Sequence, residues 1–433
     1  MTYADAIQSL YDLRWFGAKL GLENTRRLAE MAGSPQDRLR FIHVAGTNGK
    51  GSTCALLESI YRAAGLRVGL FTSPHLVSFG ERIQVNRVPI SEAEVAAGVE
   101  ALRPWLACFT PDEHPTFFEA VTVMALRHFA AAACDLVIWE TGLGGRLDAT
   151  NIVTPLASVI TNIQYDHQKW LGATLDLIAA EKAGIIKPGR PAITGTEAPE
   201  ALAVIAARAR EVGAPLTVVP RAAAEAPPLD TLDLPLRGRH QRMNAAVALA
   251  TVRTLAREIP VEPDQIRAGL GRVSWAGRLQ LVTLPTGGRV LLDGAHNADG
   301  AAILAEALRD LFPGSRPALV LGILQDKDRG EMCRLLTPLA GRIVVVPVQS
   351  DRTSGTAELA AVCRAVCPGS SVEECPRLGP AIERLAGEPL TVVAGSLYLV
   401  GEALEYLEAG PGGRRDERGL NEWTGERPGG GDR

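Results

Sequence analysis

The sequence of 433 residues has no long apolar run, no excess of basic charge and no regular spacing of its cysteines. A membrane-spanning helix needs about 18 consecutive apolar residues, so none is expected. The formal net charge is -4, whereas a nucleic-acid binder is expected to carry a basic face. The start, MTYADAIQSLYDLRW, lacks the basic region and apolar core of a signal peptide. We therefore expect a cytoplasmic protein without nucleic-acid or membrane partners.

The seven cysteines are an odd number and are widely scattered. Cys363, Cys367 and Cys375 lie closest together, but they lack C-x-x-C spacing and have no histidine nearby. Zinc sites usually show both features. We therefore predict buried or free thiols rather than a metal cluster.

Apolar, β-branched runs alternate with helix patterns along most of the chain. The runs include RFIHVAG, LRVGLFTS, CDLVIWETG and LASVITNI, and later GGRVLLDGAH, PALVLGIL, RIVVVPV and LTVVAGS. This alternation is typical of a parallel sheet covered on both faces. The length favours two domains. We predict a doubly wound α/β domain at 1–285, a smaller Rossmann-like α/β domain at 286–409, and a disordered, Gly- and charge-rich tail at 410–433.

The stretch VAGTNGKGSTC, residues 44–54, joins an apolar run to a helix pattern. It departs from the common phosphate-binding loop G-x-x-x-x-G-K-[ST], because Gly51 separates Lys50 from Ser52. Glycines let backbone N–H groups approach phosphate oxygens, and the following helix N-terminus adds partial positive charge. Lys50 supplies a full charge and Ser52 a hydroxyl for phosphate or Mg²⁺. The first domain is therefore predicted to be a P-loop-type ATPase domain.

Polar residues follow three further apolar runs. Ser73, Glu140 and His167 come directly after predicted strands, and strand ends of a doubly wound sheet meet at one edge. With Ser52 they could surround the phosphates and bind Mg²⁺, although an imidazole is a less usual ligand for this ion. Alone, Glu140 could be an ordinary strand-end charge and His167 a capping or core residue.

A series of motifs carries a resemblance to a known family. The motifs are VAGTNGKGST, TSPHL, ETGLGGRLDATNIV, YDHQKWLG, EKAGIIKPGR, GRHQRMNA, GRLQ, LDGAHN, LGILQDKD and AGSLYLVGEAL. In this order they resemble folylpolyglutamate synthase, which is closely similar to bifunctional dihydrofolate synthase/folylpolyglutamate synthase and belongs to the Mur ligase superfamily. The resemblance covers nearly the whole chain before the tail.

The resemblance implies roles for individual residues. ATP phosphates would be bound by Gly49, Lys50, Gly51 and Ser52, and further ATP contacts would come from Asn244, Arg278 and Asp293. Mg²⁺ would be bound by Ser73, Glu140 and His167, and a second Mg²⁺ by Lys182 carbamylated with CO₂. His296 would lie near the reacting carboxylate. The pterin would be contacted by Thr116, Phe117, Phe118, Glu119, Leu147, Asp148 and Ala149.

Several of these residues also have simpler interpretations. Lys182 could be a surface lysine paired with Glu181, His296 could order its loop, and Phe117 or Phe118 could belong to a helix core. Lys50, Lys182 and His296 are nevertheless the residues that we predict to take part in catalysis.

The implied reaction is ATP-dependent amide ligation through an acyl phosphate. L-Glutamate would be added to tetrahydrofolate and also to dihydropteroate, with ATP between the two domains of a monomer. The alternatives are a monofunctional folylpolyglutamate synthase or another Mur-type amino-acid ligase. A peptidoglycan ligase would need a domain before the loop, and a P-loop switch or motor would need the lysine-Ser/Thr pair that this chain lacks.

Overall fold

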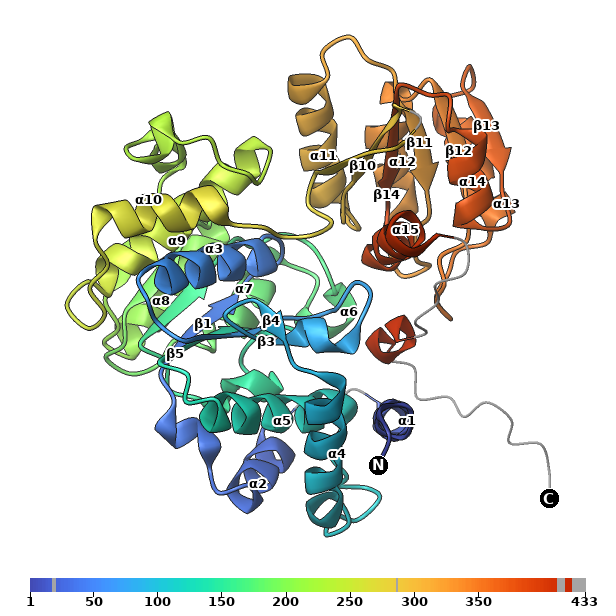
Figure 1. The fold of residues 1–433 in the computed structure, drawn as a ribbon. Helices are drawn as coiled ribbons and strands as arrows, with labels where there is room; N and C mark the ends of the chain where they lie inside the picture. Colours follow the sequence, from blue (N-terminus) through green and yellow to red (C-terminus); the bar gives the residue numbers. More distant parts are fainter. Residues whose placement is uncertain (18–20, 286, 411–416, 423–433) are drawn as a thin grey trace, which may run out of the picture.

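The protein is described from a computed structural model, which describes residues 1–17, 21–285, 287–410 and 417–422. These residues form two α/β domains, each built around one mostly parallel sheet (Figure 1). The predicted fold class is therefore confirmed. In the described ranges, no helix is long and apolar enough to cross a membrane.

The first domain contains an eight-stranded sheet in the order β4-β3-β2-β5-β1-β6-β7-β8. Its strands are β1 Phe41–Ala45, β2 Val68–Phe71, β3 Ile83–Val85, β4 Val88–Pro89, β5 Leu136–Glu140, β6 Ala157–Ile160, β7 Ala192–Thr194 and β8 Leu216–Val218. In this sheet the β2-β3 and β3-β4 pairs are antiparallel. The remaining pairs, β2-β5, β5-β1, β1-β6, β6-β7 and β7-β8, are parallel.

Helices cover both faces of this sheet. They are α1 Tyr3–Leu13, α2 Glu23–Met31, α3 Lys50–Ala63, α4 Glu92–Leu106, α5 Phe117–Ala131, α6 Gln168–Leu171, α7 Leu175–Ala183, α8 Pro199–Glu211, α9 Arg239–Thr254 and α10 Pro263–Arg272. The two faces bury separate cores, one around α3 and α9 and the other around α1, α4 and α5. Figure 1 shows α3, α9 and α10 on one side of the domain and α2, α4 and α5 on the other.

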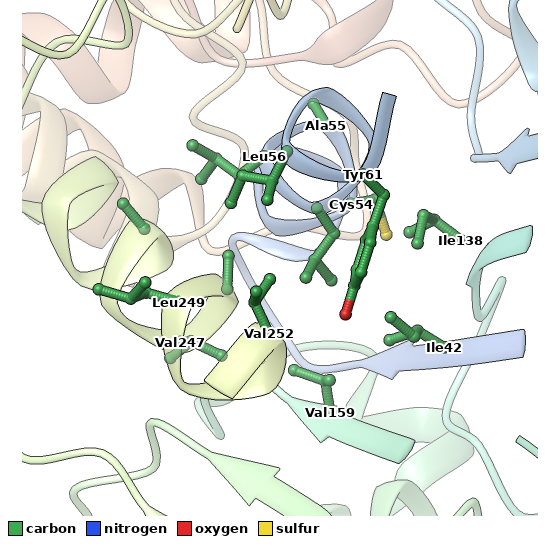
Figure 2. Close-up of a cluster of buried hydrophobic side chains, with 14 of the residues drawn as sticks. Ile42, Cys54, Ala55, Leu56, Tyr61, Ile138, Val159, Val247, Leu249 and Val252 are labelled. Carbon is green, nitrogen blue, oxygen red and sulfur yellow. The ribbon is translucent and has the colours of Figure 1, made fainter. Parts of the chain in front are cut away.

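Successive side chains of a buried strand point to opposite faces of the sheet and so belong to different cores. Ile42 and Val44 of β1 face α3, whereas Phe41 faces the opposite core. Figure 2 shows Tyr61 of α3 beside Ile42 and Ile138, with Val252 of α9 on its other side. Each such buried apolar side chain contributes about 1.5–3 kcal/mol relative to exposure. The helix that starts at the glycine-rich loop is therefore firmly seated on the sheet.

The second domain has a six-stranded sheet in the order β13-β12-β11-β14-β10-β9. Its strands are β9 Gln280–Thr283, β10 Arg289–Leu292, β11 Ala318–Leu321, β12 Arg342–Val345, β13 Ser371–Glu374 and β14 Leu390–Ala394. Its helices are α11 Ala298–Leu311, α12 Arg329–Leu336, α13 Thr356–Val366, α14 Leu378–Arg384 and α15 Leu397–Ala409. All pairs except β9-β10 are parallel, which agrees with a Rossmann-like domain.

Short 3-10 helices complete the described chain. They lie at Arg14–Phe16, Pro35–Arg38, Phe79–Arg82, Ala149–Ile152, Arg221–Glu225, Leu229–Thr231, Thr337–Leu339 and Arg418–Asn421.

The predicted domain boundary after residue 285 needs correction. Strand β9 precedes this position, yet it pairs with β10 as part of the second sheet, with Val282 opposite Val290. A boundary after 285 would cut this antiparallel pair. Leu284 N–H also donates to the Gly288 carbonyl at 2.8 Å, which continues this pairing, so the boundary must lie before Gln280.

The predicted disorder of 410–433 is wrong for residues 417–422. Gly410 ends α15 with a φ of 72°, and Arg418–Asn421 form a 3-10 helix. Leu420 is buried in the core beside α1 and α4. The residues that bury it are distant in the sequence, so the local composition did not indicate this packing. Residues 411–416 and 423–433 lie outside the described residues.

Candidate active site

The first sheet brings four strand ends to one edge. Strands β2, β5, β1 and β6 are neighbours in this order and run parallel. Ser73 follows β2, Glu140 ends β5, the loop 46–49 follows β1, and the segment 161–167 follows β6. Parallel strands end on the same side of a sheet, where doubly wound folds bind ligands. The candidate residues of four separate motifs therefore lie at one edge.

The glycine-rich loop is fixed by the segment that follows β6. Asn48 N–H donates to Asn162 Oδ1 at 2.8 Å, and Thr161 Oγ1 donates to the Asn48 carbonyl at 2.6 Å. A Cβ at Gly46 would collide with Thr161 Oγ1. Glycine at this position permits the close approach of the two segments.

Gly49 and Gly51 shape the start of α3. Gly49 is the N-cap residue in the left-handed region, with φ 80°, and a Cβ there would collide with the Asn244 side chain of α9. A Cβ at Gly51 would lie 3.0 Å from the Trp275 ring. The unpaired N–H groups of the first helical turn, which also contains buried Ser52, form a site suited to an anion.

Lys50 folds back over the loop from which it comes. Its Nζ donates to the carbonyls of Gly46 and Thr47, each at 3.1 Å. Lys182 of α7 donates to the same Gly46 carbonyl at 2.9 Å. The Lys50 ammonium therefore lies beside the loop, which favours the binding of phosphate groups, and Lys182 lies against the same carbonyl.

Lys182 is only 4% exposed. Burial, and then the nearby charge of Lys50, lower the pKa of Lys182 to about 7. The alternative of a surface pair with Glu181 is wrong, because Glu181 instead pairs with Arg146 at 2.7 Å. Lys182 thus belongs to the loop environment and not to the helix surface.

Glu140 and Ser73 are in direct contact. Glu140 Oε2 accepts a hydrogen bond from Ser73 N–H at 3.0 Å, and the glutamate is 3% exposed. Burial raises the pKa of Glu140 to about 7, although the Lys50 charge acts in the opposite direction. A cation beside this carboxylate would favour its ionised form. An ordinary exposed strand-end charge does not describe Glu140.

His167 is the N-cap residue of α6 and lies in the left-handed region, with φ 49°. Burial lowers its pKa, which favours the neutral imidazole that binds metals. The part of the chain that the structure describes contains no group of three or more His, Cys, Asp or Glu placed to hold a metal ion. The predicted set of Ser73, Glu140, His167 and Lys182 contains only two residues of these types. A metal there would need water or phosphate oxygens as further ligands.

Asp166, which precedes His167, connects this edge to the second domain. Its carboxylate lies 2.6 Å from Lys327 Nζ and 3.6 Å from His296 Nε2, and it accepts a hydrogen bond from Asn297 Nδ2 at 3.0 Å. Burial acts to raise the pKa of Asp166, but the His296 contact and the Lys327 charge outweigh it and hold the pKa well below its ordinary value. The carboxylate is therefore ionised.

The glycine-rich loop also contacts the second domain directly. Asn48 Nδ2 donates to Asp299 Oδ2 at 2.8 Å, and Asn297 Nδ2 donates to Asn48 Oδ1 at 3.1 Å. Asn297 is also the N-cap of α11, since its Oδ1 accepts from Gly300 N–H at 2.8 Å. The start of α11 is thus fixed against the loop.

Asp293 and Arg278 lie together beside the second sheet. Asp293 accepts hydrogen bonds from the N–H groups of Leu279 and Ala295 at 2.9 and 3.0 Å. Burial raises the pKa of Asp293, while the Arg278 charge acts in the opposite direction. His296 Nδ1 lies 2.7 Å from the Gly294 carbonyl, so this residue also orders its own loop.

The first predicted pterin segment has a strong structural role. Thr116 and Glu119 form a reciprocal cap of α5, and Glu119 also accepts from Thr25 Oγ1 at 3.2 Å. Phe117 belongs to the buried core, as its simpler interpretation predicted. Phe118 is partly buried, and its ring lies so close to Gly142 that a Cβ there would collide with it.

The second predicted pterin segment lies beside the first. Asp148 Oδ2 accepts from Leu143 N–H at 2.7 Å, and Asp148 also caps the 3-10 helix that begins at Ala149. Leu147 is partly exposed and Ala149 is buried. Because residues 142 and 143 follow Glu140 closely, Phe118 and Asp148 both border the end of β5.

The sequence argument missed the residues that join the domains. These are Asn48, Asp166, Asn297, Asp299 and Lys327. All of them except Asp299 lie within the quoted motifs, and Asp299 follows LDGAHN closely. Their partners are more than 100 residues away, so only the fold pairs them.

Two family models match this chain. The Mur ligase middle domain matches residues 44–214, and the Mur ligase glutamate ligase domain matches residues 277–397. The second match begins before β9, in agreement with the corrected boundary.

Curated relatives cover nearly the whole chain. The dihydrofolate synthase/folylpolyglutamate synthase of Bacillus subtilis is 37% identical over 94% of this chain and 99% of its own length. The Escherichia coli protein of the same name is 36% identical over 90% of this chain and 92% of its own.

Solved structures agree with these relatives. The crystal structure of folylpolyglutamate synthase from Thermotoga maritima has a TM-score of 0.83 and 35% identity, covering 96% of this chain and 98% of that one. Escherichia coli FolC in complex with DHPP and ADP has a TM-score of 0.83 and 33% identity, covering 94% and 98%. The chain therefore belongs to the Mur ligase family and, within it, to the dihydrofolate synthase/folylpolyglutamate synthase group of ATP-dependent ligases.

Proposed function

We propose that the chain joins L-glutamate to a reduced folate and also to dihydropteroate, using ATP to activate the accepting carboxylate. The observation that carries this proposal is that Lys50 and Glu140 lie at the same sheet edge as Asn48 and Asp166, which contact the second domain. The near full-length relatives whose names include both activities support it.

The reaction has two steps. A carboxylate oxygen of the folate attacks the γ-phosphorus of ATP, the bond to the β,γ-bridging oxygen breaks, and ADP leaves an acyl phosphate. The glutamate amine then attacks the acyl carbon, phosphate departs, and the amine loses a proton. Lys50 and the N–H groups at the start of α3 would stabilise the negative charge that develops on the phosphoryl oxygens.

Glu140, Ser73 and His167 would hold Mg²⁺ at this edge. The buried Glu140 carboxylate has a pKa raised by burial, and a divalent cation would favour its ionised form. Bound Mg²⁺ would neutralise phosphate charge. The protein side chains would align the γ-phosphate with the accepting carboxylate.

Lys182 is the residue that we propose to be carbamylated. Its burial beside the loop and its hydrogen bond to Gly46 support a role inside the site. The Lys182 amine would attack CO₂, form an N–C bond and lose a proton, which replaces an ammonium by an anionic carbamate. Supplying ¹³C-bicarbonate should give a carbamate carbon signal in the wild-type protein and none in Lys182→Arg. An unchanged signal in the variant would reject this assignment.

Nucleotide contacts would come from both domains. Asn244 lies against Gly49 of the loop, while Arg278 and Asp293 lie beside the second sheet. His296, within reach of Asp166, would face the accepting carboxylate. Closure of the two domains would assemble these groups around ATP and exclude water from the acyl phosphate.

The pterin would lie near the end of β5. Phe118 offers an aromatic face beside Gly142, and Asp148 orders the neighbouring loop. A flat heterocycle suits such a face. Thr116, Phe117 and Glu119 would act mainly by holding α5 in place, since they serve as its cap and core.

A product assay tests the proposed function. With ATP and glutamate, we expect dihydropteroate to give dihydrofolate and tetrahydrofolate to give γ-glutamyl derivatives. Folate glutamylation without dihydrofolate formation would leave a monofunctional folylpolyglutamate synthase. Loss of both products would favour another Mur-type amino-acid ligase. We also expect the protein to be cytoplasmic and monomeric. Sedimentation of the purified chain would test whether it is a monomer.

A further inference from the structure

The described part of the C-terminal tail, residues 417–422, lies between the two domains. Five of the six residues are buried, and Gly419 is partly exposed. Figure 1 shows this short red helix near α1 of the first domain and below α15 of the second. We call residues 417–422 the strap. Its side chains contact residues of both domains, so it forms a connection between them in addition to the chain itself.

Glu417 fixes one end of the strap to the first domain. Its Oε2 accepts hydrogen bonds from Phe79 N–H at 2.6 Å and from Tyr3 Oη at 2.9 Å. Its carbonyl lies 2.9 Å from His75 Nε2. His75 and Phe79 belong to the loop 74–82, which begins directly after Ser73. The strap therefore contacts the loop that leads away from a candidate metal ligand.

Asn421 contacts the same loop at two further points. Arg82 donates to Asn421 Oδ1, and Asn421 Nδ2 donates to the His75 carbonyl at 3.1 Å. Arg82 also donates from Nε to His75 Nδ1 at 2.8 Å and is only 3% exposed. The strap thus supplies hydrogen-bond partners for buried polar groups of this loop. Loss of a partner from a buried polar group destabilises a protein.

Arg418 and Glu422 fix the strap to the second domain. Arg418 pairs with Glu405 of α15 at 2.7 Å and donates to Gln349 at 3.2 Å. Glu422 pairs with Arg352 at 2.9 Å, while its carbonyl accepts from Arg14 of the first domain at 3.2 Å. Both ends of the strap therefore bridge the domains.

A continuous series of ion pairs leads from the strap to the reaction edge. Arg352, paired with Glu422, also lies 3.3 Å from Asp326. Asp326 lies 4.0 Å from Lys327, whose Nζ lies 2.6 Å from Asp166. Movement of the strap would therefore change the position of the Lys327 ammonium relative to Asp166 at the candidate active site.

We propose that the strap is a positioning element for the ligase reaction, because it fixes the loop 74–82 after Ser73 and sets the second domain, through Arg352 and Lys327, against Asp166. The inference rests on the proposed function for its kinetic readout. It adds a structural readout that does not depend on any activity. The strap is absent from the motifs that identify the family.

Two truncations test the proposal. Ending the chain after residue 422 keeps the strap, and ending it after residue 410 removes it. We expect the protein that ends at 422 to have the same kcat/KM for glutamate addition as the full chain. The second should lose roughly tenfold to a hundredfold in kcat/KM for glutamate addition, the scale expected when reacting groups are misplaced by about 1 Å. Adding the peptide 411–433 should restore part of this activity.

Trypsin cleavage provides the readout that does not depend on activity. Arg82 is buried under the strap, so we expect faster cleavage after Arg82 in the protein that ends at 410, and slow cleavage in the protein that ends at 422. If the full chain made no glutamyl product, the proposed function would fail, while this cleavage comparison would still test the strap.

A point variant covers the case in which the shorter protein does not fold. Glu422→Gln keeps the shape of the strap but removes its charge beside Arg352. We expect roughly a threefold to tenfold lower kcat/KM, in line with loss of a partly buried ion pair. The matched control is Glu408→Gln, a substitution at an exposed glutamate of α15, and its kcat/KM should equal that of the full chain. The melting temperature should fall for Glu422→Gln, which loses a largely buried ion pair, and should stay close to that of the full chain for Glu408→Gln.

Two results would overturn the proposal. The first is equal activity and equal protection of Arg82 in the proteins that end at 410 and 422. The second is higher activity without the strap, which would make it an autoinhibitory contact. Equal effects of Glu422→Gln and Glu408→Gln would likewise reject the ion-pair route.

Discussion

The two sides of the candidate site are built differently. On the first domain, Lys50, Lys182 and Gly46 form a unit within one domain, because both lysines donate to the same carbonyl. On the second domain, Lys327 and Asn297 contact Asp166 and Asn48 of the site across the interface. The chemical groups of the first side are thus assembled locally, whereas those of the second depend on domain placement.

This difference suggests a division of work. The first side would bind and stabilise phosphate charge in any domain arrangement. The second side would complete the site only when the domains are in register. Variants of the first side should therefore remove catalysis, and variants of the second should change the coupling between domains.

The largest expected effect is that of Lys50→Met. It removes the charge over the loop while keeping most of the side-chain volume. We expect a roughly thousandfold lower kcat/KM for ATP-dependent glutamate addition, on the scale of losing one charge-stabilising donor. Lys169→Met, at an exposed lysine of α6, should retain full activity. Equal activities for both variants would remove Lys50 from the mechanism.

The next effect tests the domain contact itself. Asp166→Asn and Lys327→Met each remove the same ion pair at the domain contact, so both should lower activity. In the double variant the losses should not add, with a coupling energy of about 1 to 3 kcal/mol, as for contacting charges. The measurement is kcat/KM for all four proteins. Strict additivity would mean that the 2.6 Å contact has no role in the reaction.

A pair of glycine variants separates backbone strain from crowding. Gly49 and Gly65 have φ values of 80° and 90°, but only Gly49 lacks space for a Cβ, which would collide with Asn244. Backbone strain should make alanine cost about 1 kcal/mol of stability at either position, and the collision with Asn244 should add to this cost at Gly49. Only Gly49→Ala should also weaken ATP binding, measured by calorimetry. Similar ATP affinities in both variants would contradict the tight fit of the loop against Asn244.

The smallest expected effect is that of Glu181→Gln. This residue precedes Lys182, but it forms an exposed pair with Arg146. Such pairs contribute less than about 1 kcal/mol, so unfolding and activity should both be nearly unchanged. Lys182→Arg should instead lose most activity. If the two neighbours behaved alike, the distinction between buried and surface positions on α7 would not matter for function.

Much of the fold and of the first side of the site could be predicted from the sequence. Continuous apolar runs predicted β1, β2, β5 and β6, and the order of elements predicted that Ser73, Glu140 and His167 share an edge. The three-residue strand β7 was not predicted from the sequence. Strand β9 was missed because it lies before a turn that resembled a domain linker.

The second side and the strap could not be predicted from local sequence. Asp166 stands beside His167 in a quoted motif, but its partner Lys327 is 161 residues away. Leu420 lies in a segment whose composition indicates disorder, yet it is buried against helices near the start of the chain. Composition describes what a segment can do alone, and it does not reveal partners that tertiary structure provides.

The central claim is that ATP activates the accepting carboxylate before glutamate is joined to it. The direct test uses a substrate whose carboxylate carries ¹⁸O and measures the phosphate released with each amide bond. We predict that one ¹⁸O is transferred to phosphate, because the attacking carboxylate oxygen departs with it. Amide product accompanied by phosphate without ¹⁸O would contradict the acyl-phosphate route.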